Sequence, residues 1–233
     1  MLRFIISDLH LNSWEDNTNI DGIKLFFEKL LKYKNSFELF ILGDLLECSQ
    51  GNYKEILKFH KEIFNLLYRI SKKKKVLISL FNGNHDDYKL CDLMVDIDLK
   101  KTMVYNFYIE DNIYYSHGRE FDPLFRDKES LKTRFLERAI KYFGKIEKKL
   151  KLNKNDIDDN FISNYYHKKI QEKAVNFKKN NGYNKVIFGH THIFESNKNY
   201  INTGCMTLNN TDITILNKST GLFQVFKDIE EVL

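Results

Sequence analysis

The 233-residue sequence contains a single proline, Pro123, and three cysteines. The near-absence of proline excludes a Pro-rich linker or recognition segment. The cysteines, Cys48, Cys91 and Cys205, are widely spaced and form no CxxC pattern. This spacing argues against a disulfide framework and favours free thiols in an intracellular protein.

Long apolar runs are also missing. No run reaches the roughly 18 residues needed to cross a bilayer. The N-terminal segment MLRFIISDLHL has only a short apolar run before an acid and a histidine interrupt it. It lacks the features of a secretory signal peptide, so we expect a cytoplasmic location.

Hydrophobic residues make up 42% and aromatic residues 14% of the chain, which predicts a packed globular core. The net charge of +5 is unevenly distributed. The segment 126–185 has 17 basic against 8 acidic side chains, and the rest of the chain has 20 against 24. Such a basic segment indicates either a phosphate-bearing partner or a solvated helical face, and the composition does not decide between them.

Four short apolar runs predict buried strands, and each is followed at once by a polar cluster. The clusters are SDLHL, GDLLE, GNHD and GHTH, after runs at Leu2–Ser7, Glu38–Leu42, Val76–Phe81 and Lys185–Phe188. Helical periodicity over 23–31 and 56–67 separates the first three runs. This alternation predicts parallel βαβ units. FYIEDNIYYSHG predicts a further strand pair, and the C-terminal segments YINTGCM, DITIL and LFQVF predict antiparallel strands that close the sheet.

The pattern changes between His117 and Gly189. The segments 129–151 and 160–179 predict two long, charged amphipathic helices. We interpret residues 122–182 as a helical cap inserted into a core formed by residues 1–121 and 183–233. The lysines at 72–75 predict a solvated turn, and Asp122 is expected to cap the first cap helix.

Polar groups that can bind metals follow five of the predicted strands. They are Asp8, His10, Asp44, Asn84, His117, His190 and His192. A lone histidine after a strand is more often structural than a ligand, but parallel strands bring their carboxyl ends to one edge of a sheet. Mixed imidazole, carboxylate and amide ligands suit Mn, Fe(II), Co or Zn rather than Ca. Seven ligands exceed the needs of one tetrahedral ion and suffice for two ions if one carboxylate bridges, an arrangement suited to phosphoryl transfer.

In this order, DLH, GD, GNHD, HG and GHTH resemble the five blocks of the calcineurin-like metallophosphoesterases. The blocks span residues 8–192. The resemblance implies an α/β fold, a four-layer αββα sandwich, here with an inserted helical cap. It also implies a metal-dependent hydrolase with two divalent ions, Mn being favoured over Fe, Zn or Co.

The resemblance assigns a role to each block residue. One ion would be held by Asp8, His10 and His192. The second would be held by Asn84, His117 and His190, with Asp44 bridging the two. His85 would stay off the metals as the catalytic residue that stabilises or protonates the leaving oxygen.

Asp86 would orient a ligand without touching the metals. Asn84 would also contact the substrate. Arg119 would either bind a substrate phosphate or form a salt bridge, and the sequence favours neither.

Among such enzymes, the chain is most similar to UDP-2,3-diacylglucosamine hydrolases, which release UMP and a lipid monophosphate. With a lipid-linked nucleotide substrate, peripheral contact with the cytoplasmic face of the inner membrane is expected. Three features depart from that subfamily: His85 replaces a frequent arginine, Arg119 replaces a frequent aspartate, and the pair Cys205–Met206 replaces a small or acidic residue followed by tryptophan. A metallophosphoesterase of other specificity, a nucleotide phosphodiesterase or nuclease, is the alternative. A non-catalytic binding scaffold is disfavoured because all seven ligands and His85 are present.

Overall fold

The computed structural model describes residues 1–13, 19–49, 51–86, 88–123, 159–206, 211–227 and 229–232. Residues 1–118 and 182–233 form one compact unit, and residues 119–181 form a second. The predicted cap helix over 129–151 lies outside the described residues. The assignment of 122–182 as a cap stays a prediction.

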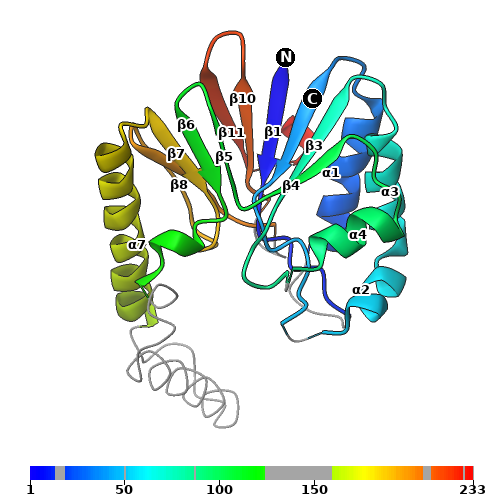
Figure 1. Cartoon of the computed structure of the whole chain (residues 1–233), viewed down its shortest axis with the longest axis horizontal. Helices are drawn as coiled ribbons and strands as arrows, with labels where there is room; N and C mark the ends of the chain where they lie inside the picture. Colours follow the sequence, from blue (N-terminus) through cyan, green and yellow to red (C-terminus); the bar gives the residue numbers. More distant parts are fainter. Residues whose placement is uncertain are drawn as a thin grey trace. The chain divides into compact units, whose positions relative to one another are not determined.

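The first unit contains two sheets, with helices beside them (Figure 1). The first sheet has the strand order β11-β10-β1-β2-β3-β4, and β1 to β4 run parallel. The second has the order β5-β6-β7-β9-β8, with β6, β7 and β9 parallel. The strands are β1 Leu2–Ile6, β2 Phe37–Ile41, β3 Val76–Phe81, β4 Thr102–Tyr105, β5 Phe107–Glu110, β6 Ile113–Ser116, β7 Lys185–Phe188, β8 Phe194–Ser196, β9 Tyr200–Thr203, β10 Ile213–Asn217 and β11 Leu222–Phe226.

Side-chain alternation along the strands of the first sheet explains the layers. On β2, Phe37, Leu39 and Ile41 pack in a core with residues of α1 and α3. The intervening Phe40 packs in a second core with Tyr115 of β6 and Ile187 of β7. Helices α1 and α3 therefore cover the outer face of the first sheet, as Figure 1 shows, and the two sheets pack against each other. The helices are α1 Ile20–Lys32, α2 Tyr53–Phe59, α3 Lys61–Ser71, α4 Leu90–Asp96 and α7 Asp159–Asn181, with short 3₁₀ turns η1 Arg119–Phe121 and η2 Ile229–Glu231.

This α/β architecture of two packed sheets with flanking helices confirms the predicted fold class, with two corrections. The helical pattern over 56–67 is two helices, because the chain breaks at His60, whose buried imidazole Nε2 lies 2.6 Å from the carbonyl oxygen of Asn12. The C-terminal strands are not all antiparallel neighbours: β9 pairs parallel to β7 in the second sheet, whereas the β10–β11 hairpin extends the first.

The lysine run at 72–75 is partly structural rather than a freely solvated turn. The ammonium group of Lys73 donates to the carbonyl oxygens of Leu30, Leu31 and Tyr33, at 3.0, 2.6 and 2.6 Å. These carbonyls stand at the C-terminal end of α1, where unpaired carbonyl groups and the helix dipole favour a cation. Lys72 pairs with Asp98 at 2.8 Å.

The second unit contains η1 and α7. The ring of Phe121 lies 5.3 Å from that of Phe177 on α7, and the hydroxyl of Tyr166 donates to the carboxylate of Asp122. Ile170 and Ala174 on α7 are fully buried. Asp122 therefore has a partner on α7, and its predicted capping role concerns a helix outside the described residues.

Candidate metal centre

The structure brings the predicted site residues of the first unit to one edge of the two sheets. Because the strands that precede them run parallel within each sheet, their carboxyl ends meet there. Asp8 and His10 follow β1, Asp44 follows β2, Asn84, His85 and Asp86 follow β3, His117 follows β6, and His190 and His192 follow β7. Arg119 belongs to the second unit, so its predicted phosphate contact stays a prediction.

One group of ligand atoms comes from Asp8, His10 and His192. The two imidazole Nε2 atoms lie 3.0 Å apart. Oδ1 of Asp8 lies 3.3 Å from Nε2 of His192 and 3.8 Å from Nε2 of His10. With metal–ligand bonds of about 2.1 Å, neighbouring ligand atoms stand about 3.0–3.4 Å apart, so these three atoms are close to the spacing that one divalent ion requires.

A second group surrounds Nε2 of His117. This atom lies 3.0 Å from Oδ1 of Asn84, 3.2 Å from Oδ2 of Asp44 and 3.2 Å from Nδ1 of His190. The same Oδ2 of Asp44 is 3.8 Å from Nε2 of His10 in the first group. Asp44 therefore lies between the two groups, where the resemblance placed a bridging carboxylate.

The backbone is strained at the predicted ligands. Five of the seven have φ between +47° and +74°, a region that non-glycine residues rarely adopt. They are Asp8, His10, Asp44, His190 and His192. Such conformations cost about 1–3 kcal/mol each and cluster at functional sites. Folding stability alone does not account for this concentration at one sheet edge.

Two glycines of the motifs leave no room for a side chain. A Cβ atom on Gly83 would stand 2.0 Å from Oδ1 of Asp44, and one on Gly189 would stand 2.4 Å from Oδ2 of Asp8. The carboxylates of Asp44 and Asp8 thus lie in close contact with the backbone at Gly83 and Gly189. This close approach explains why glycine precedes Asn84 and His190 in the sequence.

Backbone amides fix both carboxylates. Oδ1 of Asp44 accepts from the amide of His85 at 2.8 Å, and Oδ2 of Asp8 accepts from the amide of His190 at 3.0 Å. The other oxygen of Asp8, Oδ1, is buried and has no hydrogen-bond partner among the described residues. A buried carboxylate oxygen is costly to leave unsatisfied, and a cation bound here would satisfy it.

The imidazoles of His10 and His117 are held in the orientation that a ligand needs. Nδ1 of His117 lies 2.8 Å from the carbonyl oxygen of Leu42, and Nδ1 of His10 lies 2.9 Å from Oε2 of Glu47. Donation from each Nδ1–H to these oxygens leaves Nε2 as the ligand atom. The residues present therefore fit a divalent metal centre.

Electrostatics agree with a site built for positive charge. Burial alone would lower the pKa of His117, but the carboxylates of Asp44 and Asp8 raise it to about 10. Burial likewise opposes the imidazolium of His10, yet Asp8 and Glu47 raise its pKa to about 10. Burial would raise the pKa of Asp8, but His10 and His192 hold it well below its usual range. The carboxylates thus attract cationic charge to this edge.

Asp86 is buried and belongs to neither ligand group. Its carboxylate accepts from the amides of Asp44 at 2.9 Å, Leu46 at 2.9 Å and Gly83 at 2.8 Å. Burial and the nearby charge of Asp44 raise the pKa of Asp86 to about 7, although the amides favour its ionised form. Asp86 therefore joins the loops after β2 and β3.

The sequence interpretation missed Glu47. Its Oε1 lies 2.7 Å from Nδ1 of His85 and its Oε2 lies 2.9 Å from Nδ1 of His10. Ser49 also lies 2.9 Å from Nδ1 of His85. The only sequence signal was an acid three residues after Asp44 in GDLLE, which by itself is unremarkable on a polar loop. Only the folded chain places this acid between a predicted ligand and the predicted catalytic histidine.

The sequence profile of calcineurin-like phosphoesterases matches residues 1–194. The chain belongs to this family. It is therefore a metal-dependent phosphoesterase with a divalent metal centre at the sheet edge described above. Comparison with curated protein sequences gave no significant match.

Solved structures similar to this phosphoesterase include a novel archaeal phosphodiesterase, 16% identical, with a TM-score of 0.50 over 97% of this chain and 99% of that one. A Vps29 single mutant from Entamoeba histolytica is 15% identical, with a TM-score of 0.45 over 97% of each chain. A predicted phosphoesterase from Streptococcus pneumoniae is 10% identical, with a TM-score of 0.36 over 97% of each chain. At these identities the first comparison supports the fold alone.

The cysteines and the apolar segments of the phosphoesterase are also subjects of the sequence predictions. Cys205 is buried, as expected, and its thiol donates to the carbonyl oxygen of His192 at 3.5 Å. None of Cys48, Cys91 and Cys205 forms a disulfide in the described part of the chain. Among the described residues, no helix has the length and apolar character needed to span a membrane.

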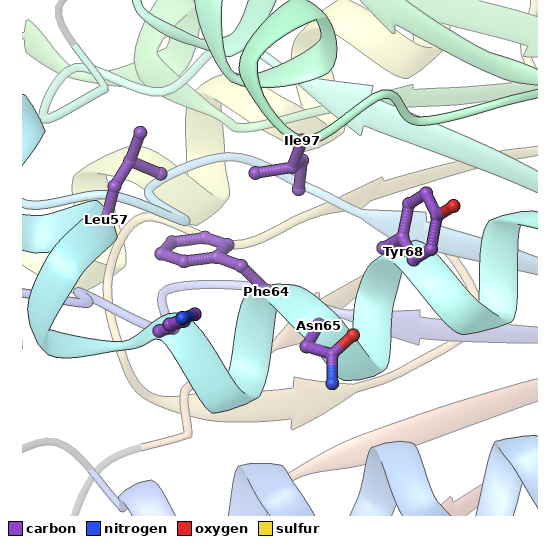
Figure 2. Close-up of a pocket in the computed structure, with 6 residues that line it drawn as sticks. Leu57, Phe64, Asn65, Tyr68 and Ile97 are labelled. Carbon is purple, nitrogen blue, oxygen red and sulfur yellow. The ribbon is translucent and has the colours of Figure 1, made fainter.

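A hollow of about 230 Å³ lies on the helical side of the first sheet (Figure 2). In Figure 2, Ile97 faces Phe64 and Tyr68 of α3 across this hollow, with Leu57 of α2 to one side. Its lining includes no predicted site residue. The hollow and the metal centre therefore share no residue.

Proposed function

We propose that this phosphoesterase hydrolyses a phosphodiester or diphosphate bond at a centre for two divalent ions. The arrangement of Asp44 carries this proposal, because one of its oxygens lies 3.2 Å from Nε2 of His117 and 3.8 Å from Nε2 of His10. Asp8, His10 and His192 would hold one ion, and Asn84, His117 and His190 the other, with Asp44 shared. When bound, such a pair supplies an activated water and neutralises charge on the phosphate. Mn is the ion we favour.

His85 is proposed as the general acid. Its Nδ1 is held by Glu47, so the other ring nitrogen, Nε2, is the one that can donate a proton. During hydrolysis a bond forms between phosphorus and the water oxygen, and the bond to the leaving oxygen breaks. The Nε2 proton of the imidazolium passes to that leaving oxygen, and the carboxylate of Glu47 stabilises the imidazolium before transfer. The side chain is 29% exposed, so substrate can reach it.

The substrate that we propose is UDP-2,3-diacylglucosamine, which would be cleaved to a lipid monophosphate and UMP. Its support is the block pattern together with the basic segment 126–185, which has 17 basic and 8 acidic side chains and is rich in phenylalanine and tyrosine. In this proposal Arg119 binds a substrate phosphate, and contact with the membrane surface delivers the lipid. The same basic segment would also suit a nucleic-acid backbone, which makes a nuclease the second candidate.

The deciding experiment measures UMP release from UDP-2,3-diacylglucosamine in detergent with added Mn, beside hydrolysis of bis-p-nitrophenyl phosphate and of single-stranded DNA. UMP release far faster than generic ester hydrolysis would support the lipid-linked nucleotide. Generic hydrolysis without UMP release would retain the phosphodiesterase and reject this substrate. DNA cleavage that falls steeply with salt would favour the nuclease. No metal-dependent hydrolysis of any of the three would contradict the proposed function.

A further inference from the structure

Tyr88 occupies a backbone position that is unfavourable for its residue type. It lies in a turn closed by a hydrogen bond from the amide of Lys89 to the carbonyl oxygen of Asp86, at 2.9 Å. Tyr88 directly precedes Lys89 in this turn, and its φ is +59°. Turns with positive φ at this position favour glycine or asparagine, because a Cβ atom crowds the backbone there. A bulky side chain in this conformation is a genuine outlier.

Burial does not compensate for this backbone conformation. Tyr88 is 75% exposed, more than Phe59 at 53% or Phe107 at 54%. A tyrosine that is both strained and solvated contributes little to the stability of the folded state. Such strain is characteristic of functional sites, and Tyr88 lies three residues from the predicted general acid His85.

The turn is attached firmly to the metal centre. The carbonyl oxygen of His85 accepts from the amide of Cys48 at 2.9 Å, and the carboxylate of Asp86 accepts from the amides of Asp44 and Leu46. Tyr88 follows His85 by three residues, which a chain can extend by at most about 11 Å. The Cα atom of Tyr88 therefore lies no more than about 11 Å from that of His85, the predicted general acid, and its side chain is exposed to solvent.

We propose that Tyr88 is a specificity-determining residue that stacks on a nucleobase of the phosphoester substrate. This inference rests on the proposed function and narrows its substrate class to nucleotide esters. A tyrosine ring supplies a large, stiff face, and every base offers a π-face for stacking. The exposure of Tyr88 leaves its ring accessible to a base whose phosphate lies at the metal centre.

The test uses two esters with the same leaving group, thymidine 5′-(p-nitrophenyl) phosphate and methyl p-nitrophenyl phosphate, and the full-length Mn-loaded enzyme. Tyr88→Gly removes the ring and suits the positive φ, so it should fold without loss of Tm. Tyr88→Phe retains the ring. Phe59→Leu is the matched control, because it removes an exposed aromatic ring from α2. Binding of UMP, measured by calorimetry, gives a readout that does not depend on turnover.

We expect Tyr88→Gly to lower kcat/KM for the thymidine ester roughly 5- to 150-fold, mainly through KM, as loss of one base stack implies. Hydrolysis of the methyl ester should stay within about twofold, and Tyr88→Phe and Phe59→Leu should resemble the wild type. UMP binding should weaken in Tyr88→Gly.

Equal loss on both esters would overturn the stacking role, since it would indicate a positioning role for the turn. Unchanged thymidine ester hydrolysis in a folded Tyr88→Gly variant would also overturn it. If the wild type cleaved neither ester, the proposed function would fail on its own, and UMP binding equal in wild type and Tyr88→Gly would then reject the stacking inference separately.

Discussion

The carboxylate of Glu47 lies 2.7 Å from Nδ1 of His85, and its other oxygen reaches Nδ1 of His10. Hydrogen bonds from both imidazoles lower the pKa of Glu47, against the effect of burial. One carboxylate thus orients a predicted metal ligand and the predicted general acid together. This coupling makes Glu47 a positioning residue whose removal should affect both.

Glu47→Gln should lower kcat about 10- to 100-fold, the usual effect of losing a group that orients a ligand. The amide keeps the volume of Glu47 but cannot stabilise an imidazolium as the carboxylate does. Steady-state kinetics with added Mn would check this, together with metal content. If Glu47 acts partly through His85 and partly through His10, the double variant with His85→Ala should lose less than the sum of the two single losses, whereas fully additive losses would contradict the coupling to His85.

His85→Ala should lower the rate by roughly 10²- to 10⁴-fold, the range for a lost general acid. Both metal ions should remain bound, because His85 is not one of the seven predicted metal ligands. Metal analysis of the purified variant alongside its kinetics would check this. Loss of an ion from His85→Ala would show that His85 is a ligand.

Asp44→Ala and His117→Ala should each abolish metal-dependent hydrolysis while the protein stays folded. Asp44 stands between the two ligand groups, and His117 is surrounded by three other ligand atoms. Circular dichroism would confirm folding, and bound Mn per chain should fall in both variants. Substantial hydrolysis in both would be incompatible with a dinuclear centre.

Gly83→Ala should inactivate the enzyme and destabilise it by about 1–3 kcal/mol or more, because its Cβ would stand 2.0 Å from Oδ1 of Asp44. Either the carboxylate or the loop must move. Activity and thermal unfolding would be measured together. Gly221→Ala is the control for activity: its φ of +70° disfavours alanine, so stability should fall, but no heavy atom lies within 4 Å of the added methyl group and activity should be retained. Full activity in Gly83→Ala would show that the loop adapts freely.

A cluster of charges between the two sheets predicts a dependence of stability on pH. Arg3 of β1 is buried and donates to Glu38 of β2 at 2.7 Å and to Glu110 of β5, and Lys218 lies 3.0 Å from Glu110. Burial would raise the pKa of Glu110, but Lys218 and Arg3 lower it below its ordinary value.

Because the pKa of Glu110 is lower in the folded protein, its stabilising contribution is present above the unfolded pKa of about 4.3 and is lost as the pH falls through the folded pKa. Glu110→Gln should therefore destabilise the protein at neutral pH and reduce its loss of stability under acid conditions. Urea unfolding of both proteins at pH 7 and near pH 3 would test this. An equal decline in both would show that the ion pairs contribute nothing measurable.

The sequence by itself determined the strands and the residues that follow them. The bounds of β3 and β7 match their apolar runs, because a buried strand must be apolar along its length. The clustering of Asp8, Asp44, Asn84, His117 and His190 also followed from sequence, since parallel strands that end in polar groups place those groups together.

Only the tertiary structure decided the rest, because those features depend on contacts between segments far apart in the chain. Helical periodicity cannot show that the chain breaks at His60, whose partner is Asn12. The apolar pattern of the C-terminal strands likewise does not show that β9 pairs with β7 rather than with β10. Glu47 and Lys73 are of residue types that are common on protein surfaces, so the sequence does not single them out. Only the fold brings the carboxylate of Glu47 to the imidazoles of His10 and His85, and the ammonium group of Lys73 to the end of α1.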